Sequence, residues 1–221
     1  MALGGLAGGS VSGSLGALWD GHVLPRLVER ACRSHIILDE RRRCVPRASG
    51  EVLEVGVGSG LNLALYDPQR VTRVVGIDPS EPLLVKARQR AGAAAVHVQL
   101  LRAAAEQLPF DSARFDSAVV TYTLCSVADP AKALAEVRRV LRPGGRLLFI
   151  EHGLAPDAAP RRWQVRITPW WRRASGNCHL DRDVEREIET AGFVVDELRA
   201  AYAEGSPRWL SYTYEGIATD P

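Results

Sequence analysis

The stretch Glu54-Val-Gly56-Val-Gly58-Ser-Gly60 decides the fold of this chain. It follows an apolar run over 51–55, which predicts a strand, and precedes a helix-like segment over 61–66. Glycines are needed where a strand turns sharply, because the backbone must adopt positive φ or let a ligand approach closely. The spacing differs from the G-x-G-x-x-G of dinucleotide-binding loops, and the Glu54 carboxylate would repel pyrophosphate but could attract a cation. The loop predicts a nucleotide-like ligand, with an ordinary tight turn as the alternative.

An acidic residue follows the second expected strand. That strand, 71–77, ends at Asp78-Pro79-Ser80, and Asp78 lies 24 positions after Glu54. In α/β nucleotide-binding folds a carboxylate at this place accepts the ribose hydroxyls. Asp78 could also cap the helix that follows, and the two roles are compatible. Together the loop and the acid predict a nucleoside site.

Short apolar runs alternate with helix-like segments along most of the chain, which is typical of βαβ units in a doubly wound α/β fold. Five strands are expected over 51–55, 71–77, 95–101, 115–121 and 145–151, with helices over 81–90 and 131–141. A helix over about 182–191 then ends at Gly192, and two last strands are expected over 193–198 and 209–218. Their short turn at 205–207 favours an antiparallel edge. We therefore predict a mostly parallel, seven-stranded sheet with an antiparallel last strand.

The chain is expected to form one domain over 19–221, preceded by a flexible leader over 1–18. Helices expected over 19–31 and 34–43 would build an N-terminal lid within 19–47. The first 18 residues have no basic segment, and glycine and serine interrupt their apolar residues. This argues against a signal peptide or a spanning helix.

Composition excludes several classes of protein. With 221 residues, 46% of them apolar, the chain can bury a sizeable core, so a disordered protein or a disulfide-stapled miniprotein is excluded. The 28 basic and 26 acidic residues nearly balance, which does not suggest a nucleic-acid partner. The four cysteines are scattered, so we expect reduced thiols and a cytoplasmic protein.

The segment 156–180 is expected to be an insertion on the acceptor side of the site. Between 158 and 180 the chain has five arginines and no acid, so the remainder carries 23 basic and 26 acidic groups, a net charge of −3. The insertion also holds Trp163, Trp170 and Trp171. Interleaved Trp and Arg suit a solvated lid with aromatic anchors, contact with a phospholipid surface, or nucleic acid. Of these partners we expect no nucleic acid, and we keep peripheral membrane contact through 161–173 as an alternative to the lid.

Five motifs in order make the chain resemble the class I S-adenosylmethionine-dependent methyltransferases. The motifs are Glu54-x-Gly56-x-Gly58-x-Gly60, Gly76-Ile-Asp78-Pro-Ser, Ala105-Glu106-x-Leu108-Pro109-Phe110, Phe115-Asp116-x-x-Val119 and Arg139-Val-Leu141-x-Pro143-Gly144-Gly145-x-Leu147. The resemblance implies a Rossmann-like methyltransferase fold that binds S-adenosyl-L-methionine.

The resemblance also implies roles for individual residues. The glycine loop would contact the methionine and ribose portions of the cofactor, Asp78 the ribose, and the Ala105-Glu106 pair the adenine. Relatives often have a polar residue just before that pair, whereas Ala103 and Ala104 stand here. The cofactor-binding residues would be Glu54, Gly56, Gly58, Gly60, Asp78, Pro79, Ser80, Ala105, Glu106, Thr121 and Cys125.

The acceptor side is less defined. Glu151-His152-Gly and a later Cys178-His179-Leu-x-Arg182 are similar to motifs of small methyltransferases related to alkyl thiol, phospholipid and ubiquinone/menaquinone-pathway enzymes. This implies a small, apolar acceptor that is a thiol, a phospholipid amine or a quinone-like ring. His152 and His179 are the candidate catalytic residues, and a structural role for His152 is the alternative. Cys125 is expected to be a buried wall residue, and no metal site is expected because the local spacing supplies too few ligands.

The predicted function is methyl transfer from S-adenosylmethionine to this small molecule. Two alternatives remain at this stage. A nicotinamide-dependent oxidoreductase is disfavoured by the glycine spacing, and a non-catalytic membrane-surface protein would use only the Arg/Trp insertion.

Overall fold

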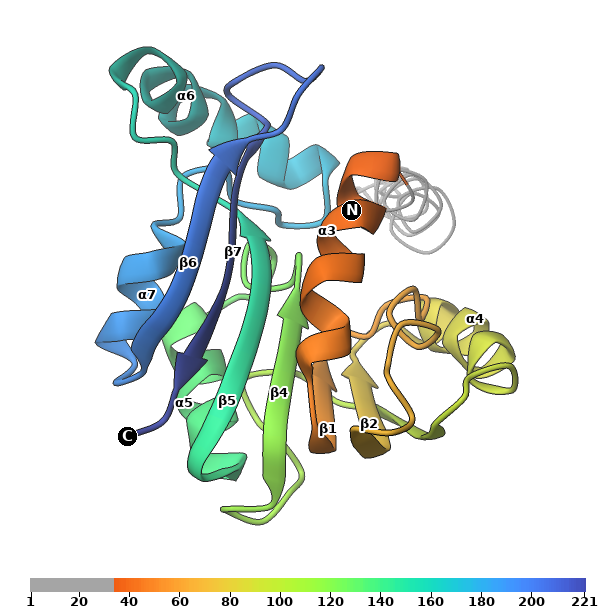
Figure 1. Cartoon of the computed structure of the whole chain (residues 1–221). Coiled ribbons are helices and arrows are strands. Elements are labelled where there is room, and N and C mark those ends of the chain that lie inside the picture. Colours follow the sequence, from red (N-terminus) through yellow and green to blue (C-terminus); the bar gives the residue numbers. More distant parts are fainter. Residues whose placement is uncertain (1–33) are drawn as a thin grey trace, which may run out of the picture.

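The computed structural model describes residues 34–221. The predicted leader, the helix over 19–31 and the first part of the lid lie outside this range. Seven strands form one sheet in the order β3-β2-β1-β4-β5-β7-β6 (Figure 1). The strands are β1 (Gly50–Val55), β2 (Val71–Asp78), β3 (His97–Arg102), β4 (Phe115–Thr121), β5 (Leu141–His152), β6 (Val194–Tyr202) and β7 (Tyr212–Thr219).

The sheet is parallel except at β7, which pairs antiparallel with both β5 and β6. The predicted mostly parallel sheet with an antiparallel last strand is therefore confirmed. The closing strands enter in the order β5-β7-β6, so the last strand lies inside the sheet and β6 forms its edge.

Helices cover both faces of the sheet. They are α3 (His35–Cys44), α4 (Glu81–Ala91), α5 (Pro130–Val140), α6 (Ala158–Ala174) and α7 (Val184–Thr190), with a short 3₁₀ helix over Val45–Arg47. One apolar cluster joins Leu134 of α5 and Ile188 of α7 to the sheet, and the other joins Cys44 of α3 and Leu84 of α4. Burial on both faces explains the apolar runs 118–120 of β4 and 147–150 of β5.

The helix predicted over 61–66 is wrong. Residues 58–66 form successive turns. Their backbone N–H groups donate to the carbonyl three residues earlier, as from Gly60 N to Val57 O (2.8 Å) and from Leu65 N to Asn62 O (2.8 Å). Gly58 and Gly60 have φ of +54° and +81°, which a right-handed helix cannot contain. The buried Asn62 side chain also bonds to the sheet rather than projecting from a helix surface.

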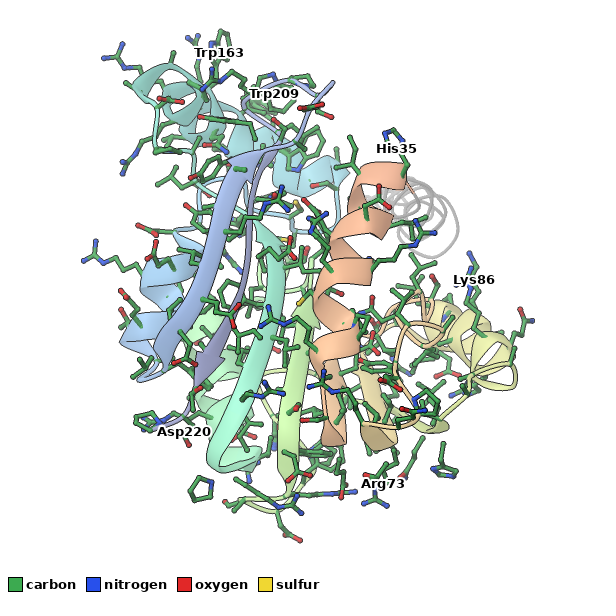
Figure 2. All side chains as sticks on the ribbon, in the orientation of Figure 1. His35, Arg73, Lys86, Trp163, Trp209 and Asp220 are labelled. Carbon is green, nitrogen blue, oxygen red and sulfur yellow. The ribbon has the colours of Figure 1, made fainter. Side chains whose placement is uncertain are left out.

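The insertion folds as the 17-residue helix α6, despite Pro169 in its interior. Its inner face is polar: the buried Gln164 side chain accepts from Ala155 N and donates to Gly153 O, both at 2.8 Å. These bonds fix α6 to the segment that follows β5. The outer face holds Trp163, which points away from the rest of the molecule (Figure 2).

Parallel pairing brings the carboxyl ends of four strands to one edge. Val55 pairs with Ile77 and Val120, and Thr121 pairs with Ile150. Ligands of open α/β sheets bind at this edge. None of the helices in the described part of the chain combines the length and apolar character that crossing a membrane requires.

Candidate functional site

A cavity of about 580 Å³ opens at the carboxyl edge of the sheet. Its size is within the ordinary range for small-molecule sites. The predicted site residues among those that line it are Gly56, Gly58, Asp78, Pro79, Ser80, Ala105, Glu106 and Thr121. Glu54, Gly60 and Cys125 do not line it. One continuous space thus collects most of the predicted cofactor residues.

Asp78 ends β2 and is fixed by two backbone bonds. Its Oδ2 accepts from Gly58 N at 2.9 Å, and its Oδ1 accepts from Ser80 N at 2.8 Å. Burial raises the pKa of Asp78, and these two bonds act in the opposite direction. Each carboxylate oxygen retains a lone pair for a further donor. The carboxylate is therefore oriented to accept ligand hydroxyls. The prediction that Asp78 caps α4 is wrong, because Ser80 is the N-cap; Asp78 acts as a turn residue through its bond from Ser80 N.

The glycines of the loop serve different purposes. A Cβ on Gly56 would lie 2.1 Å from Thr123 Oγ1, so that glycine permits close packing within the protein. A Cβ on Gly58 would meet nothing closer than 3.9 Å, and its φ is +54°. Gly58 therefore combines a left-handed conformation that other residues rarely adopt with open space around its Cα, as expected where a ligand approaches the backbone.

Glu54 lies beneath the loop in a buried polar network. It accepts from Asn62 Nδ2 at 3.0 Å and from Tyr66 Oη at 2.9 Å. Burial raises the pKa of Glu54 to about 7, although these bonds and Arg41 oppose the rise. Glu54 is fully enclosed by protein, so its effect on a bound cation would be electrostatic and pH-dependent near neutrality.

Arg41 is a cavity residue that the sequence did not identify. Its Nη1 donates to Asn62 Oδ1 at 2.6 Å and to Thr121 Oγ1 at 2.8 Å, and its buried Nε has no partner in the described structure. Arg41 is the first of three consecutive arginines in α3, and composition alone does not show which of them faces inward.

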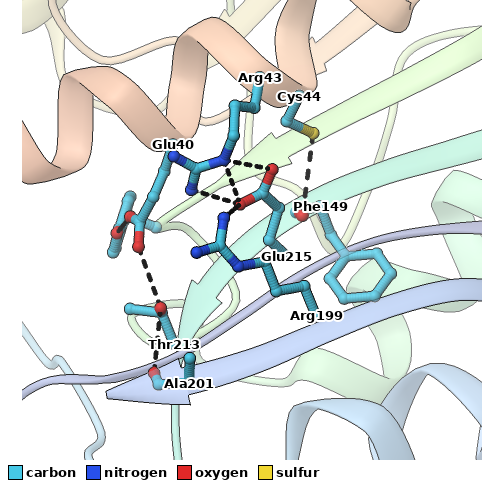
Figure 3. A network of polar contacts seen from close by, with 9 residues as sticks. Glu40, Arg43, Cys44, Phe149, Arg199, Ala201, Thr213 and Glu215 are labelled. Carbon is cyan, nitrogen blue, oxygen red and sulfur yellow. Dashed lines mark hydrogen bonds and ion pairs between the residues drawn. The ribbon is translucent and has the colours of Figure 1, made fainter. Parts of the chain in front are cut away.

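The neighbours of Arg41 hold α3 against the sheet. Arg43 Nη2 lies 2.6 Å from Glu215 Oε2 of β7, and Glu40 Oε1 accepts from Thr213 Oγ1 at 3.0 Å (Figure 3). Since these residues flank Arg41, they fix the turn of α3 that directs Arg41 into the cavity.

The adenine side of the predicted site is an apolar wall. Ala103, Ala104 and Ala105 line the cavity next to Glu106. Glu106 Oε1 accepts from Ala128 N at 2.9 Å and from Asp129 N at 3.3 Å. Its carboxylate is thus committed to the segment before α5, and apolar contact dominates this wall.

The loop after β4 is held by two buried charged residues from the C-terminal motifs. Glu151 accepts from the backbone N–H groups of Thr123 (2.6 Å), Leu124 (2.9 Å) and Cys125 (3.3 Å). Arg182 donates to the carbonyls of Leu124 and Val127. The Glu151 and Arg182 motifs, distant in sequence, therefore act on the same loop, which forms the cavity wall through residues 121–123 and 126–128.

The candidate catalytic histidines do not line the cavity. His152 Nε2 lies 3.0 Å from Cys178 Sγ, and its ring lies 6.2 Å, centre to centre, from that of the cavity residue Tyr122. Burial would lower the pKa of His152, but the contact with Cys178 and the charge of Glu151 raise it overall. His179 Nδ1 lies 3.6 Å from Asp181 Oδ1. Their catalytic roles stay predictions.

Asn62, Tyr66, Glu151 and Arg182 also organise the site and were not assigned roles from the sequence. In the sequence, Arg182 and Glu151 are identified only as members of the C-terminal motifs, without a role of their own. A signal for them exists in principle, because charged residues beside otherwise apolar runs are expected to be paired when buried.

The comparisons with known proteins agree with this geometry. The family model described as "Methyltransferase domain" matches residues 53–149. Thiol S-methyltransferase TMT1B of Homo sapiens is 39% identical over 170 residues, 74% of this chain and 68% of that protein. The chain spans 65% of the length of the Rattus norvegicus protein of the same name.

Two shorter matches are to methyltransferases that are named for other acceptors. Demethylmenaquinone methyltransferase of Thermus thermophilus is 38% identical over 125 residues, 54% of this chain and 56% of that protein. Phosphatidylethanolamine N-methyltransferase of Cereibacter sphaeroides is 37% identical over 113 residues, 50% of this chain and 54% of that protein.

Solved structures share the fold. A putative methyltransferase from Haloferax volcanii, solved in complex with the Trm112 methyltransferase activator, has a TM-score of 0.68 at 21% identity. The match covers 93% of this chain and 97% of that one. At this identity the likeness shows the fold alone.

The cavity residues fit S-adenosylmethionine, the cofactor of this family. Asp78 offers acceptors to ribose hydroxyls, Gly58 leaves space for a ligand against the backbone, and the unpartnered Arg41 Nε supplies a buried donor. The alanines at 103–105 offer a flat apolar wall to a base. The fold, the cavity and the match to a relative covered over two thirds of its length together assign the chain to the S-adenosylmethionine-dependent methyltransferase family.

Proposed function

We propose that this protein transfers the methyl group of S-adenosylmethionine to the thiol of a small, apolar molecule. The observation that carries the choice of a thiol is the length of the match. The human thiol methyltransferase aligns over 170 residues, so the similarity extends beyond 53–149 into segments outside the cofactor core. The menaquinone and phosphatidylethanolamine relatives align over only 125 and 113 residues.

The cavity supports an apolar acceptor. It continues from the cofactor side to Ser126, Ser175 and Gly176, and its lining includes Leu61, Leu83 and Val127. Ser175 and Gly176 follow α6, so the insertion contributes to the expected acceptor side. Because most of the surface that lines the whole cavity is apolar, an acceptor enclosed in it would lose much of its hydration.

The chemistry places modest demands on this chain. S-adenosylmethionine supplies an electrophilic methyl group on a positively charged sulfur when bound. The protein has to align the acceptor with that group and exclude water. A thiol must also lose its proton, because the thiolate is the nucleophile. His152 stays the predicted base, and it contacts the cavity through the ring of Tyr122.

The test is transfer of radiolabelled methyl groups to a matched panel of acceptors. The panel contains an alkanethiol, the amine and alcohol with the same carbon chain, phosphatidylethanolamine vesicles and a demethylated quinone. We expect labelling of the thiol, its loss in Asp78→Ala, and its retention in Asp111→Ala, which changes an exposed carboxylate outside the cavity. Labelling of only the amine, the lipid or the quinone would overturn the choice of a thiol.

We also propose that the outer face of α6 contacts anionic membrane surfaces. Trp163 and Trp170 are 54% and 72% exposed, within the described part of the chain. Arg166 and Arg173 lie over their rings, at 5.9 and 5.4 Å. The spacing 163, 166, 170, 173 puts these four on one helical face. Exposed tryptophans support this proposal over a solvated lid in which they would be core anchors; only Trp171 packs inward, against Trp209 at 6.0 Å.

A further inference from the structure

Three potential metal ligands meet beside the cavity although they are far apart in sequence. The ligand atoms of Cys125, His152 and Cys178 all lie within 4.8 Å of one another. They come from the loop after β4, the end of β5 and the connection between α6 and α7. The local spacing around Cys178 lacks further ligands, as expected from the sequence, but the fold supplies them from two other elements.

The sulfur of Cys178 is the centre of this cluster. His152 Nε2 lies 3.0 Å from it, and Trp171 Nε1 donates to it at 3.3 Å. Cys125 Sγ lies 3.4 Å from Ser126 Oγ. A neutral thiol is a weak acceptor, whereas a metal-bound thiolate accepts N–H and O–H bonds well. The neighbouring Cys125 thiol and burial raise the pKa of Cys178, whereas the contact with His152 lowers it. A positive ion beside the two sulfurs would favour their thiolate forms.

The distances are close to those of a bound ion. Tetrahedral Zn²⁺, with bonds of about 2.3 Å to sulfur and about 2.0 Å to nitrogen, holds its ligand atoms roughly 3.5–3.8 Å apart. The observed limit of 4.8 Å and the His152–Cys178 distance of 3.0 Å require movements of about half an ångström to one ångström. Side-chain rotation is sufficient for such movements.

We propose that Cys125, His152 and Cys178 form a binding site for a thiophilic metal ion of the Zn²⁺ class. Two cysteines and one histidine select soft or borderline ions over Mg²⁺ or Ca²⁺. On binding, the two thiols release their protons to solvent, and two thiolate sulfurs and a neutral imidazole nitrogen form bonds to the ion. No fourth His, Cys, Asp or Glu joins this group among residues 34–221, so water or another small ligand completes the coordination.

The ion would link three parts of the acceptor side. Cys125 belongs to the loop held by Glu151 and Arg182, and His179 N already donates to Cys125 O at 2.7 Å. Cys178 lies two residues after the cavity residue Gly176. A metal here would therefore stabilise the wall of the cavity without requiring that any acceptor be bound. Because its imidazole nitrogen would be bound to the ion, His152 would act as a base only in the metal-free protein.

The experiment is titration of the reduced full-length chain with Co²⁺ under anaerobic conditions, followed by competition with Zn²⁺. We expect one Co²⁺ per chain, a near-ultraviolet sulfur-to-cobalt charge-transfer band, and displacement of the Co²⁺ by Zn²⁺. Cys178→Ser and Cys125→Ser should each weaken binding by about 100-fold or more. The matched control is Cys44→Ala, because Cys44 is buried on α3, donates through its sulfur to Phe149 O at 3.9 Å, and does not belong to the metal-ligand cluster.

Calorimetry with S-adenosylhomocysteine establishes that each variant is folded. Two results would overturn the proposal: a reduced, folded parent protein that gives no charge-transfer band, or a band that survives unchanged in both Cys178→Ser and Cys125→Ser. Because the readout is metal binding, it does not depend on which acceptor the enzyme methylates.

Discussion

At the scale of single residues, Asp78 is the most direct test of the cofactor site. Its two oxygens are oriented by Gly58 N and Ser80 N and retain acceptor capacity toward the cavity. Asp78→Ala should weaken S-adenosylmethionine binding by roughly 1.5–3 kcal/mol, since charge-assisted hydrogen bonds to the ligand are lost. Isothermal titration calorimetry measures this, with Asp111→Ala as the exposed control. Equal affinities in the two variants would remove Asp78 from the site.

Glu54 predicts a pH dependence of stability. Its pKa in the folded protein is about 7, against an ordinary value of 4.5, because it is buried. The folded state therefore holds this proton more tightly than the unfolded state, so the contribution of Glu54 is most favourable below pH 4.5 and is lost as pH rises to about 7. The full change corresponds to roughly 3 kcal/mol at about 1.4 kcal/mol per pH unit.

Glu54→Gln removes the titrating group while keeping an acceptor for Tyr66. The free energy of unfolding, measured in urea between pH 4.5 and 8, should fall more steeply with pH in the parent than in the variant. Comparison of the two slopes cancels other titrating groups such as Glu187, whose pKa burial also raises to about 7. Parallel curves would mean that Glu54 titrates alike in the folded and unfolded chains.

The residues that sequence reasoning found and missed differ in how locally they are determined. Asp78 and Gly58 follow a strand directly, so their place at the sheet edge is fixed by a few neighbouring residues. Arg41 depends on the rotation of α3, which Glu40 and Arg43 fix through β7, more than 170 positions later in the chain. A single sequence contains no local record of that pairing.

At the scale of elements, the loop after β4 is held by hydrogen bonds with two buried charged side chains. Glu151 binds its N–H groups, and Arg182 binds its carbonyls. Such a loop would otherwise bury unpaired backbone groups at the edge of the sheet, which costs stability. Support of this loop thus explains the presence of Arg182 in the C-terminal motif, without direct contact with a ligand.

Arg182→Met keeps much of the side-chain volume but leaves the carbonyls of Leu124 and Val127 without this donor. We expect a loss of about 3 kcal/mol in the free energy of unfolding. Amide hydrogen exchange should also be faster over 123–127. Arg186→Met on the exposed face of α7 is the control. If both variants exchanged and unfolded like the parent, the loop would not depend on Arg182.

Strand and helix positions were largely predictable because apolar periodicity is a local property, whereas two elements show its limits. The turns over 58–66 were mistaken for a helix because their apolar residues are spaced like those of a helix, although Gly58 and Gly60 adopt left-handed φ. The sequence predicts only an insertion where α6 lies. Pro169 and an inner face made of the polar residues Gln164 and Thr168 obscure the apolar periodicity of this helix.

At the scale of the whole molecule, charge and cavity are arranged around the same edge. The five arginines of α6 contrast with the net charge of −3 on the remainder of the chain. The helix follows β5 directly, and the segment after it lines the cavity through Ser175 and Gly176. Attraction of α6 to an anionic surface would therefore bring the acceptor side of the cavity toward the lipid (Figure 1).

This arrangement predicts that anionic vesicles assist turnover of an apolar thiol dissolved in them. Trp163→Ser together with Trp170→Ser should weaken vesicle binding by about 10-fold or more, since two exposed aromatic anchors are lost. The apparent KM for the lipid-dissolved thiol should rise in the same variant, while kcat with a water-soluble thiol should stay unchanged. Flotation and initial rates measure the two quantities.

The matched control for this prediction is Val85→Ser with Leu198→Ser, which removes exposed apolar side chains from α4 and β6 instead. Added salt should weaken binding of the parent and control proteins to anionic vesicles, because the arginines act through charge, and neutral vesicles should bind poorly. If the tryptophan variant and the control bound alike, or if the parent floated with no vesicle, α6 would be a solvated wall of the acceptor site. If binding were lost but KM for the lipid-dissolved thiol were unchanged, α6 would hold the protein at the surface without delivering the acceptor.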